Sequence, residues 1–128
     1  MGGASGPAST VVLEQGGVRL AVDVEAGGRL ASLVIGGQER LIVTPSPDDR
    51  GIRWGSFLMA PWAGRIAGAR LDWGGSSHPL RANDGPNAIH GLVFDRPWRI
   101  TSSDAGSLDL EVDLGPLGWP FGGVARQA

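Results

Sequence analysis

The 128-residue sequence contains no cysteine, no lysine and no tyrosine, and all eleven of its basic residues are arginine. Without cysteine there can be no disulfide framework, no thiolate zinc site and no cysteine nucleophile. Without lysine the phosphate-binding loop G-x-x-x-x-G-K-[ST] cannot occur. The formal net charge of -2 offers no electrostatic footprint for nucleic acid or for an acidic membrane surface. We therefore expect no nucleic-acid partner.

Long apolar runs are missing as well. No window approaches the roughly 18 consecutive apolar residues of a membrane helix, and residues 1–9 have neither the basic nor the apolar region of a signal peptide. We expect a flexible N-terminus over residues 1–9, no membrane association and a cytoplasmic location. No two glycines are two positions apart, so the dinucleotide fingerprint G-x-G-x-x-G cannot occur, and the nucleophile elbow G-x-S-x-G is also absent.

What the sequence does contain is abundant glycine and proline, 22 and 9 residues, together with 41% hydrophobic residues. Apolar and polar residues alternate over residues 18–25 and 108–114, which predicts strands with one buried and one wet face. Shorter apolar runs predict further strands at residues 11–14, 30–35, 41–44, 69–73 and 97–101. Turns are predicted at the glycine pairs 16–17, 27–28, 36–37 and 74–75 and at residues 83–86. This pattern predicts one all-β domain over residues 10–128, an antiparallel β-sandwich or a barrel.

Polar and aromatic residues gather in the middle of the chain, between residues 54 and 98. Four of the five tryptophans, both histidines and both asparagines fall there, where the regular alternation stops. Long irregular segments on a β scaffold commonly carry binding residues. Arg65 follows Gly64, so its guanidinium, with five fixed donors, could approach a polyhydroxylated or anionic ligand closely. His90, beside another glycine, could give or take a proton near neutral pH.

Each of these residues also has an ordinary structural explanation. An isolated arginine in a β-rich domain most often forms a surface ion pair, and a histidine beside apolar residues is more often structural. The tryptophans most simply pack in the core and at its edges. His78, in a Ser-Ser-His-Pro turn, is expected to be solvent-exposed. Taken one at a time, the residue types leave these alternatives open.

Taken together, residues 60–66 and 83–91 form one ordered pattern. Its positions are Pro61, Arg65 and Ile66, a hairpin over residues 68–73, then Asn83, Gly85, Pro86, Asn87, Ile89, His90 and Gly91, and finally Trp98. This order resembles the aldose 1-epimerase (galactose mutarotase) family, whose hallmark is Pro-x-x-Asn-Arg-Ile, a hairpin, Asn-x-x-Asn-x-Leu-His-Gly and a Trp. Two positions depart from it, because Gly64 stands for the family's Asn and Leu92 for a frequent Gly. Residues 28–33 and 119–121 resemble two of the family's strands more loosely.

The resemblance implies a galactose-mutarotase-like β-sandwich, called a supersandwich, that interconverts the α and β anomers of a free aldose. In that reaction a base removes the anomeric hydroxyl proton and an acid protonates the ring oxygen, so that the ring opens and recloses on either face. The implied partner is a monosaccharide, a hexose, and neither a cofactor nor a metal is implied. By position, sugar binding falls to Arg65, His90 and Asn87, with His90 also catalytic and Asn87 supporting the loop.

The family also uses a second histidine as general acid and a late glutamate as general base. Both would lie downstream of residue 128, and His78 precedes the His90 segment instead of following it. Because acid–base catalysis needs both partners, we expect an N-terminal portion of the domain that is weakly active or inactive alone. Its unpaired strands would need a complementing C-terminal segment or would self-associate. Alternatives are a non-catalytic carbohydrate-binding β-sandwich module and a β domain with an accidental motif.

Overall fold

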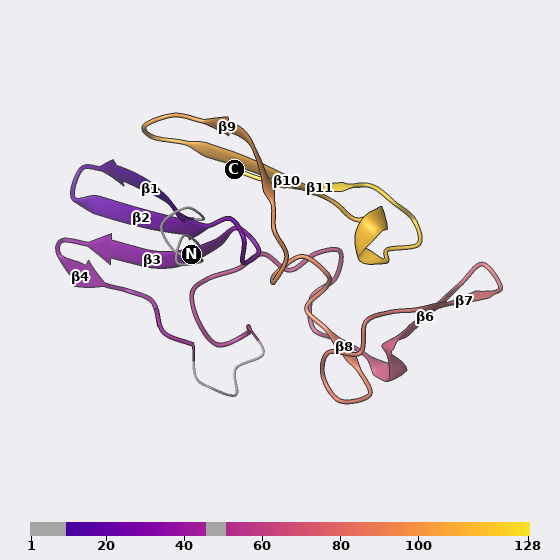
Figure 1. The fold of residues 1–128 in the computed structure, drawn as a ribbon. Coiled ribbons are helices and arrows are strands. Elements are labelled where there is room, and N and C mark those ends of the chain that lie inside the picture. The colour runs from indigo at the N-terminus through magenta and orange to yellow at the C-terminus, as the bar shows by residue number, and fades with distance from the viewer. Residues whose placement is uncertain (1–9, 46–50) are drawn as a thin grey trace, which may run out of the picture.

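The computed structural model describes residues 10–45 and 51–128, and Figure 1 shows how they are arranged. The segment expected to be flexible, residues 1–9, lies outside the described residues. Within the described part, the regular structure consists of β-strands and two short 3-10 helices, and every paired strand is antiparallel. The predicted all-β class is therefore confirmed.

The first sheet is a four-stranded meander near the N-terminal end of the described chain. Its strands, in spatial and sequence order, are β1 (Thr10–Gln15), β2 (Val18–Asp23), β3 (Arg29–Ile35) and β4 (Gln38–Glu39). Gly16 and Gly17 join β1 to β2 with φ of +59° and +81°, and Gly36 and Gly37 join β3 to β4 with +58° and +80°. Two successive positive φ angles make the tight hairpin turn that suits the twist of paired strands. The glycine pairs thus act as predicted.

The second sheet has three strands in the order β11-β10-β9. They are β9 (Arg99–Ser103), β10 (Leu108–Asp113) and β11 (Val124–Gln127). The short helix η3 (Gly115–Leu117) follows β10. Leu108, Leu110 and Val112 are buried along β10, whereas Asp113 is exposed, so the predicted alternation is confirmed.

The core lies between these two sheets, which face each other in Figure 1. It joins Val22 of β2 and Leu110 of β10 to Leu92, Val93 and Trp98 of the segment that enters β9. The indole Nε1 of Trp98 donates to the carbonyl oxygen of Val93 at 3.0 Å, so its polar atom is satisfied within the core. Two antiparallel sheets packed on a shared apolar core make the predicted sandwich.

The middle of the chain forms smaller strand pairs outside the sheets. Its elements are β5 (Arg65–Ile66), η2 (Ala67–Ala69), β6 (Arg70–Trp73), β7 (Ser76–Pro79) and β8 (Ala88–Ile89). β5 pairs with β8, and β6 pairs with β7 as a hairpin that projects away from the sandwich (Figure 1). The long-range β5–β8 pair brings the two halves of the sequence pattern together.

Three expectations from the sequence are wrong. Residues 41–44 form no strand, and Ile42 is 68% exposed, because the chain leaves the sheet after the short strand β4. Residues 119–121 lie in a turn, and the next strand begins only at Val124. His78 is half-buried rather than solvent-exposed, since its ring meets that of Phe121 edge-on at 5.4 Å between centroids.

Candidate functional site

Arg65 lies on β5, and His90 directly follows the neighbouring strand β8. The β5–β8 register pairs Arg65 with Ile89, which sets His90 beside Gly64. The N–H of Gly64 donates to Nδ1 of His90 at 3.2 Å, and the N–H of His90 donates to the carbonyl oxygen of Gly64 at 2.9 Å. The two halves of the motif are thus joined by main-chain and side-chain hydrogen bonds at the candidate site.

The hydrogen bond to Nδ1 assigns the tautomer of His90. Because Nδ1 accepts a hydrogen bond from the N–H of Gly64, the neutral form of the imidazole carries its proton on Nε2. The half-buried ring lies against two aromatic rings, with centroids 6.1 Å from Phe57 and 6.4 Å from Phe94. The backbone of His90 has φ of +61°, a left-handed conformation that is uncommon outside glycine. His90 is therefore held in one orientation with its Nε2–H as a donor.

Gly91 lets the chain pass close to the other half of the motif. It bridges to Ala60, and a Cβ at this position would lie 2.1 Å from the carbonyl oxygen of Ala60. The same oxygen accepts a hydrogen bond of 2.7 Å from the N–H of Leu92. Only a residue without a side chain allows this approach, so the glycine after His90 is required by contact.

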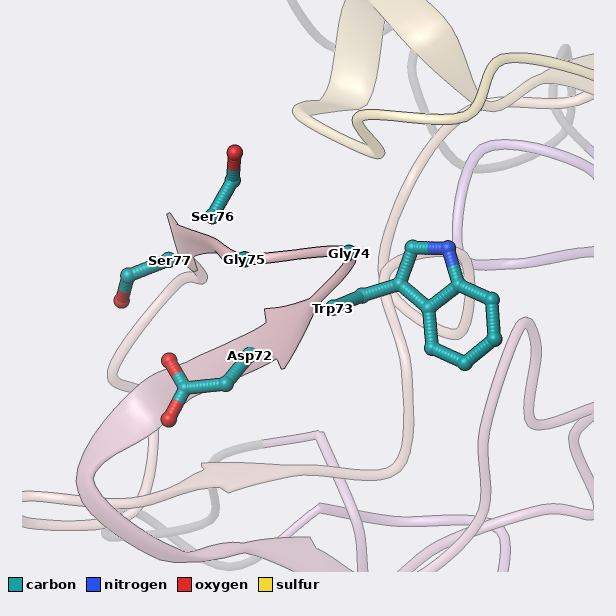
Figure 2. Close-up of a pocket in the computed structure, with 6 residues that line it drawn as sticks. All are labelled: Asp72, Trp73, Gly74, Gly75, Ser76 and Ser77. Carbon is teal, nitrogen blue, oxygen red and sulfur yellow. The ribbon is translucent and has the colours of Figure 1, made fainter.

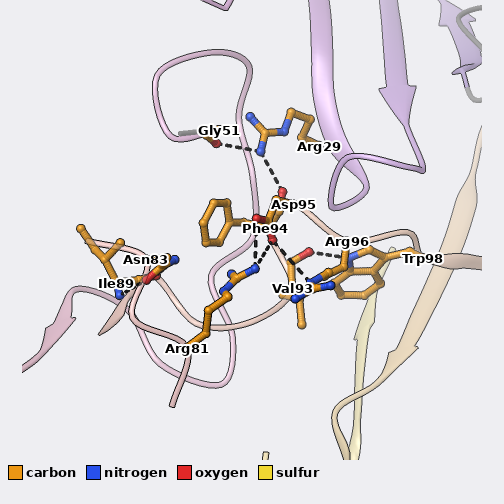
Figure 3. A network of polar contacts seen from close by, with 10 residues as sticks. All are labelled: Arg29, Gly51, Arg81, Asn83, Ile89, Val93, Phe94, Asp95, Arg96 and Trp98. Atoms are coloured by element: carbon orange, nitrogen blue, oxygen red, sulfur yellow. Dashed lines mark hydrogen bonds and ion pairs between the residues drawn. The ribbon is translucent and has the colours of Figure 1, made fainter. Parts of the chain in front are cut away.

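A tight turn precedes β8. Asp84 and Asn87 exchange two main-chain hydrogen bonds of 3.0 Å around Gly85 and Pro86, so the turn spans residues 84–87, one residue later than predicted. Asn83 uses its amide twice on Ile89, accepting from the N–H at 2.8 Å and donating to the carbonyl at 3.1 Å (Figure 3). The turn is thus fastened at its base by a side chain.

Asn87 and Arg65 connect this turn to the first half of the motif. Oδ1 of Asn87 accepts a 3.1 Å hydrogen bond from the N–H of Gly68, which supports the loop between β5 and β6. Nε of Arg65 donates to Oδ2 of Asp84 at 2.5 Å. The Arg65 side chain is nevertheless 62% exposed and remains accessible from solvent. The three residues singled out from the sequence therefore share one strand pair and the turn beside it.

The sequence reasoning missed Arg29 as part of this region. This residue is 1% exposed, and its guanidinium lies over the rings of Trp54 and Phe57, 4.4 and 4.8 Å from their centroids. It donates to four main-chain carbonyls, those of Ala26, Gly51, Trp54 and Phe94, at 2.7 to 3.0 Å. Figure 3 shows Arg29 and Phe94 in this network. Because the rings of Phe57 and Phe94 also contact the ring of His90, Arg29 helps to hold the aromatic side chains next to the candidate site.

A separate hollow lies at the tip of the β6–β7 hairpin. It is lined by residues 72–77, and Figure 2 shows Asp72 and Trp73 projecting to opposite sides of the hairpin. Trp73 is 68% exposed. None of Arg65, Asn87 and His90 lines this hollow. Within residues 10–45 and 51–128, no three His, Asp or Glu residues cluster as metal ligands would, and no helix is long and apolar enough to cross a membrane.

The sandwich and its strand pairs have the fold of galactose mutarotase-like proteins. One such protein of known structure, from Clostridium acetobutylicum, superposes with a TM-score of 0.65 at 19% identity over 81% of this chain and 35% of its own. The galactose 1-epimerase of Lactobacillus acidophilus superposes with a TM-score of 0.57 at 26% identity over 81% of this chain and 33% of its own.

The sequence itself identifies the family. The model of the aldose 1-epimerase family matches residues 9–126, so the chain belongs to the aldose 1-epimerase family. YihR, an uncharacterised protein of Escherichia coli K12, is 32% identical over 101 residues, which are 77% of this chain and 32% of YihR. The chain thus spans about a third of the length of the relatives that it matches.

Proposed function

We propose that this chain supplies part of the sugar site of an aldose 1-epimerase, which interconverts the α and β anomers of a free hexose. The observation that carries the proposal is the joining of Gly64-Arg65 to His90 across the β5–β8 pair, in a chain of that family. Anomer exchange needs proton transfer at the anomeric hydroxyl and at the ring oxygen. A fixed imidazole N–H and an exposed guanidinium, carried by these paired segments, provide donors for such oxygens.

In this proposal, His90 donates its Nε2–H to the ring-oxygen side of the sugar. Arg65 contributes guanidinium N–H groups to neighbouring hydroxyls and to the negative charge that develops as the ring opens. Asn87 keeps the β5–β6 loop in place through its bond to Gly68. Phe57 and Phe94 pack against the imidazole and help to fix its orientation.

We further propose that full activity requires groups beyond these residues. General acid–base catalysis needs two positioned partners, and the match covers about a third of each relative's length. The family's second histidine and its glutamate would be supplied by a complementing polypeptide segment. Sedimentation of the chain alone tests whether it instead self-associates through strand edges such as β11.

Sugar titration and polarimetry on the same preparations test the proposal. We expect glucose or galactose to bind, and His90→Asn and Arg65→Ala to weaken binding at least about tenfold, the usual effect of losing a hydrogen bond to a charged or fixed donor. Asn suits position 90 because it tolerates positive φ. Matched controls are His78→Asn and Arg70→Ala, which remove the other histidine and an arginine of equal exposure on the β6–β7 hairpin. Equal affinity in all four variants would refute the site.

The alternative, a non-catalytic carbohydrate-binding module, makes a different prediction for the same experiment. A module binds sugar through Arg65 and His90. It does not change the rate at which the optical rotation of freshly dissolved α-glucose or α-galactose approaches its equilibrium value. An epimerase accelerates that change over buffer, alone or after addition of a complementing segment. Acceleration that disappears in His90→Asn supports the enzyme, whereas binding without acceleration under both conditions supports the module.

A further inference from the structure

Asp84 touches Arg65 from a sheltered position. The Asp84 side chain is 15% exposed, whereas the Arg65 side chain is 62% exposed, and the two meet through Nε and Oδ2 at 2.5 Å. The main chain of Asp84 is fixed by its pair of hydrogen bonds to Asn87. The preceding residue, Asn83, is bonded through its side chain to β8. A carboxylate on a fixed turn thus contacts a guanidinium on the neighbouring strand.

The contact uses only one edge of the guanidinium. Asp84 accepts from Nε, and the Arg65 side chain makes no other hydrogen bond within the described residues. Hydrogen bonds between ionised partners are short and roughly twice as strong as neutral ones, and a sheltered carboxylate is screened less than an exposed one. The arginine is therefore anchored near its stem while its terminal Nη groups stay available to a ligand.

We propose that Asp84 is a positioning residue that fixes the Arg65 guanidinium for sugar binding. Immobilising a long side chain on binding costs conformational entropy, and a side chain held in advance avoids part of that cost. Asp84 thereby raises affinity without itself touching the sugar. This inference rests on the proposed sugar-binding role of Arg65.

The pair Arg70–Asp72 is a built-in control. It joins the same residue types at 3.1 Å on the β6–β7 hairpin, but both of its side chains are more than 60% exposed, and exposed pairs contribute little. Asp84→Asn keeps the size of the side chain and removes its charge, and Asp72→Asn does the same in the control pair. Thermal unfolding of each variant checks that the fold is retained.

Two measurements on the 128-residue chain test the inference. In the first, 15N relaxation of the Arg65 Nε–H, assigned with Arg65→Met, reports the order of that side chain. We expect Nε of Arg65 to be ordered in the wild type and mobile in Asp84→Asn, with no change in Asp72→Asn. An Nε that is already mobile in the wild type, or one that stays ordered in Asp84→Asn, overturns the proposal, whether or not sugar binds.

The second measurement is a double-mutant cycle on sugar affinity. We expect Asp84→Asn to weaken glucose or galactose binding about tenfold, the effect of one charge-assisted hydrogen bond, and Asp72→Asn to leave it unchanged. In the Arg65→Met background, Asp84→Asn should have no further effect. Equal weakening in both backgrounds would show that Asp84 acts through the turn and not through Arg65, which overturns the inference. Absence of any sugar binding by the wild type would refute the proposed function instead, and the relaxation result would still decide the role of Asp84.

Discussion

The two sheets and the segment that carries Arg65 and His90 obtain their shape in different ways. In the sheets, all strands except the short β4 pair over four to six residues, and apolar side chains such as Leu110 fill the space between the sheets. In the segment 51–98, the strands that form the candidate site are two residues long. There the chain is held by side chains that bond to main-chain groups, among them Arg29, Asn83 and His90. The sheets depend on strand pairing and apolar area, whereas the site region adds these polar contacts to its own share of the apolar core.

Glycines show the same contrast. Gly36 lies in a hairpin turn with open space around it, so only its positive φ requires glycine. Gly91 combines a positive φ with a main-chain oxygen in the place of a Cβ. In the sheets, glycine serves local turn geometry, whereas beside His90 it serves contact between segments thirty residues apart.

The largest effect is expected from Arg29→Met, which breaks the polar support of the site region. The substitution keeps an apolar stem but leaves four carbonyl acceptors without their donor in a buried place. Since each unsatisfied buried group costs about 1–3 kcal/mol, the free energy of unfolding should fall by about 4 kcal/mol or more, measured by urea titration. Arg99→Met on the exposed side of β9 is the control. Equal losses in the two variants would remove the distinction between the regions.

A smaller effect is expected from Gly91→Ala. The new Cβ meets the carbonyl oxygen of Ala60 and also forces alanine into a left-handed backbone, which together should cost about 3 kcal/mol. Gly36→Ala adds only the backbone cost, about 1 kcal/mol. Urea titration compares the two, and 1H–15N spectra should show shifts around His90 for Gly91→Ala alone. Similar losses would mean that close approach at Gly91 is unimportant.

The sheets could be predicted because their information is local. Alternation over residues 108–114 and glycine pairs at hairpin turns report on neighbours in sequence, and both match β10 and its fellow strands. Residues 41–44 have an apolar run of the same kind, yet no strand partner accepts them after β4 ends. Strands as short as β5 and β8 leave no periodic signal at all, because pairing of two residues is decided by tertiary contact.

The candidate site was predictable only through its ordered motif. Arg65, Asn87 and His90 could be chosen from the resemblance, but their bonds to Asp84, Gly68 and Gly64 depend on chain segments that fold back from 19 to 26 residues away. Arg29 lies in the looser match over residues 28–33, which gave no indication of its role. From the sequence alone, an arginine at the start of a strand is interpreted as a surface residue. Only the fold shows that this one donates hydrogen bonds to four main-chain carbonyl oxygens.

The smallest expected effect concerns a polar network on the sheet surface, where Glu111 of β10 bonds to Arg126 of β11 and Arg99 of β9. These guanidinium groups, Arg126 first, lower the pKa of the Glu111 carboxyl from its usual 4.5. A carboxyl whose pKa is lower in the folded state stabilises the fold above its unfolded pKa, and this contribution is lost as the pH falls through the folded value. The melting temperature of the wild type should therefore exceed that of Glu111→Gln at pH 7, and the difference should shrink below about pH 4.5.

Because the groups face solvent, 1 M salt should also reduce the difference at pH 7. A difference that changes with neither pH nor salt would mean that Glu111 stabilises the fold through packing. Apolar contact rather than charge would then matter even on the surface of the sheet.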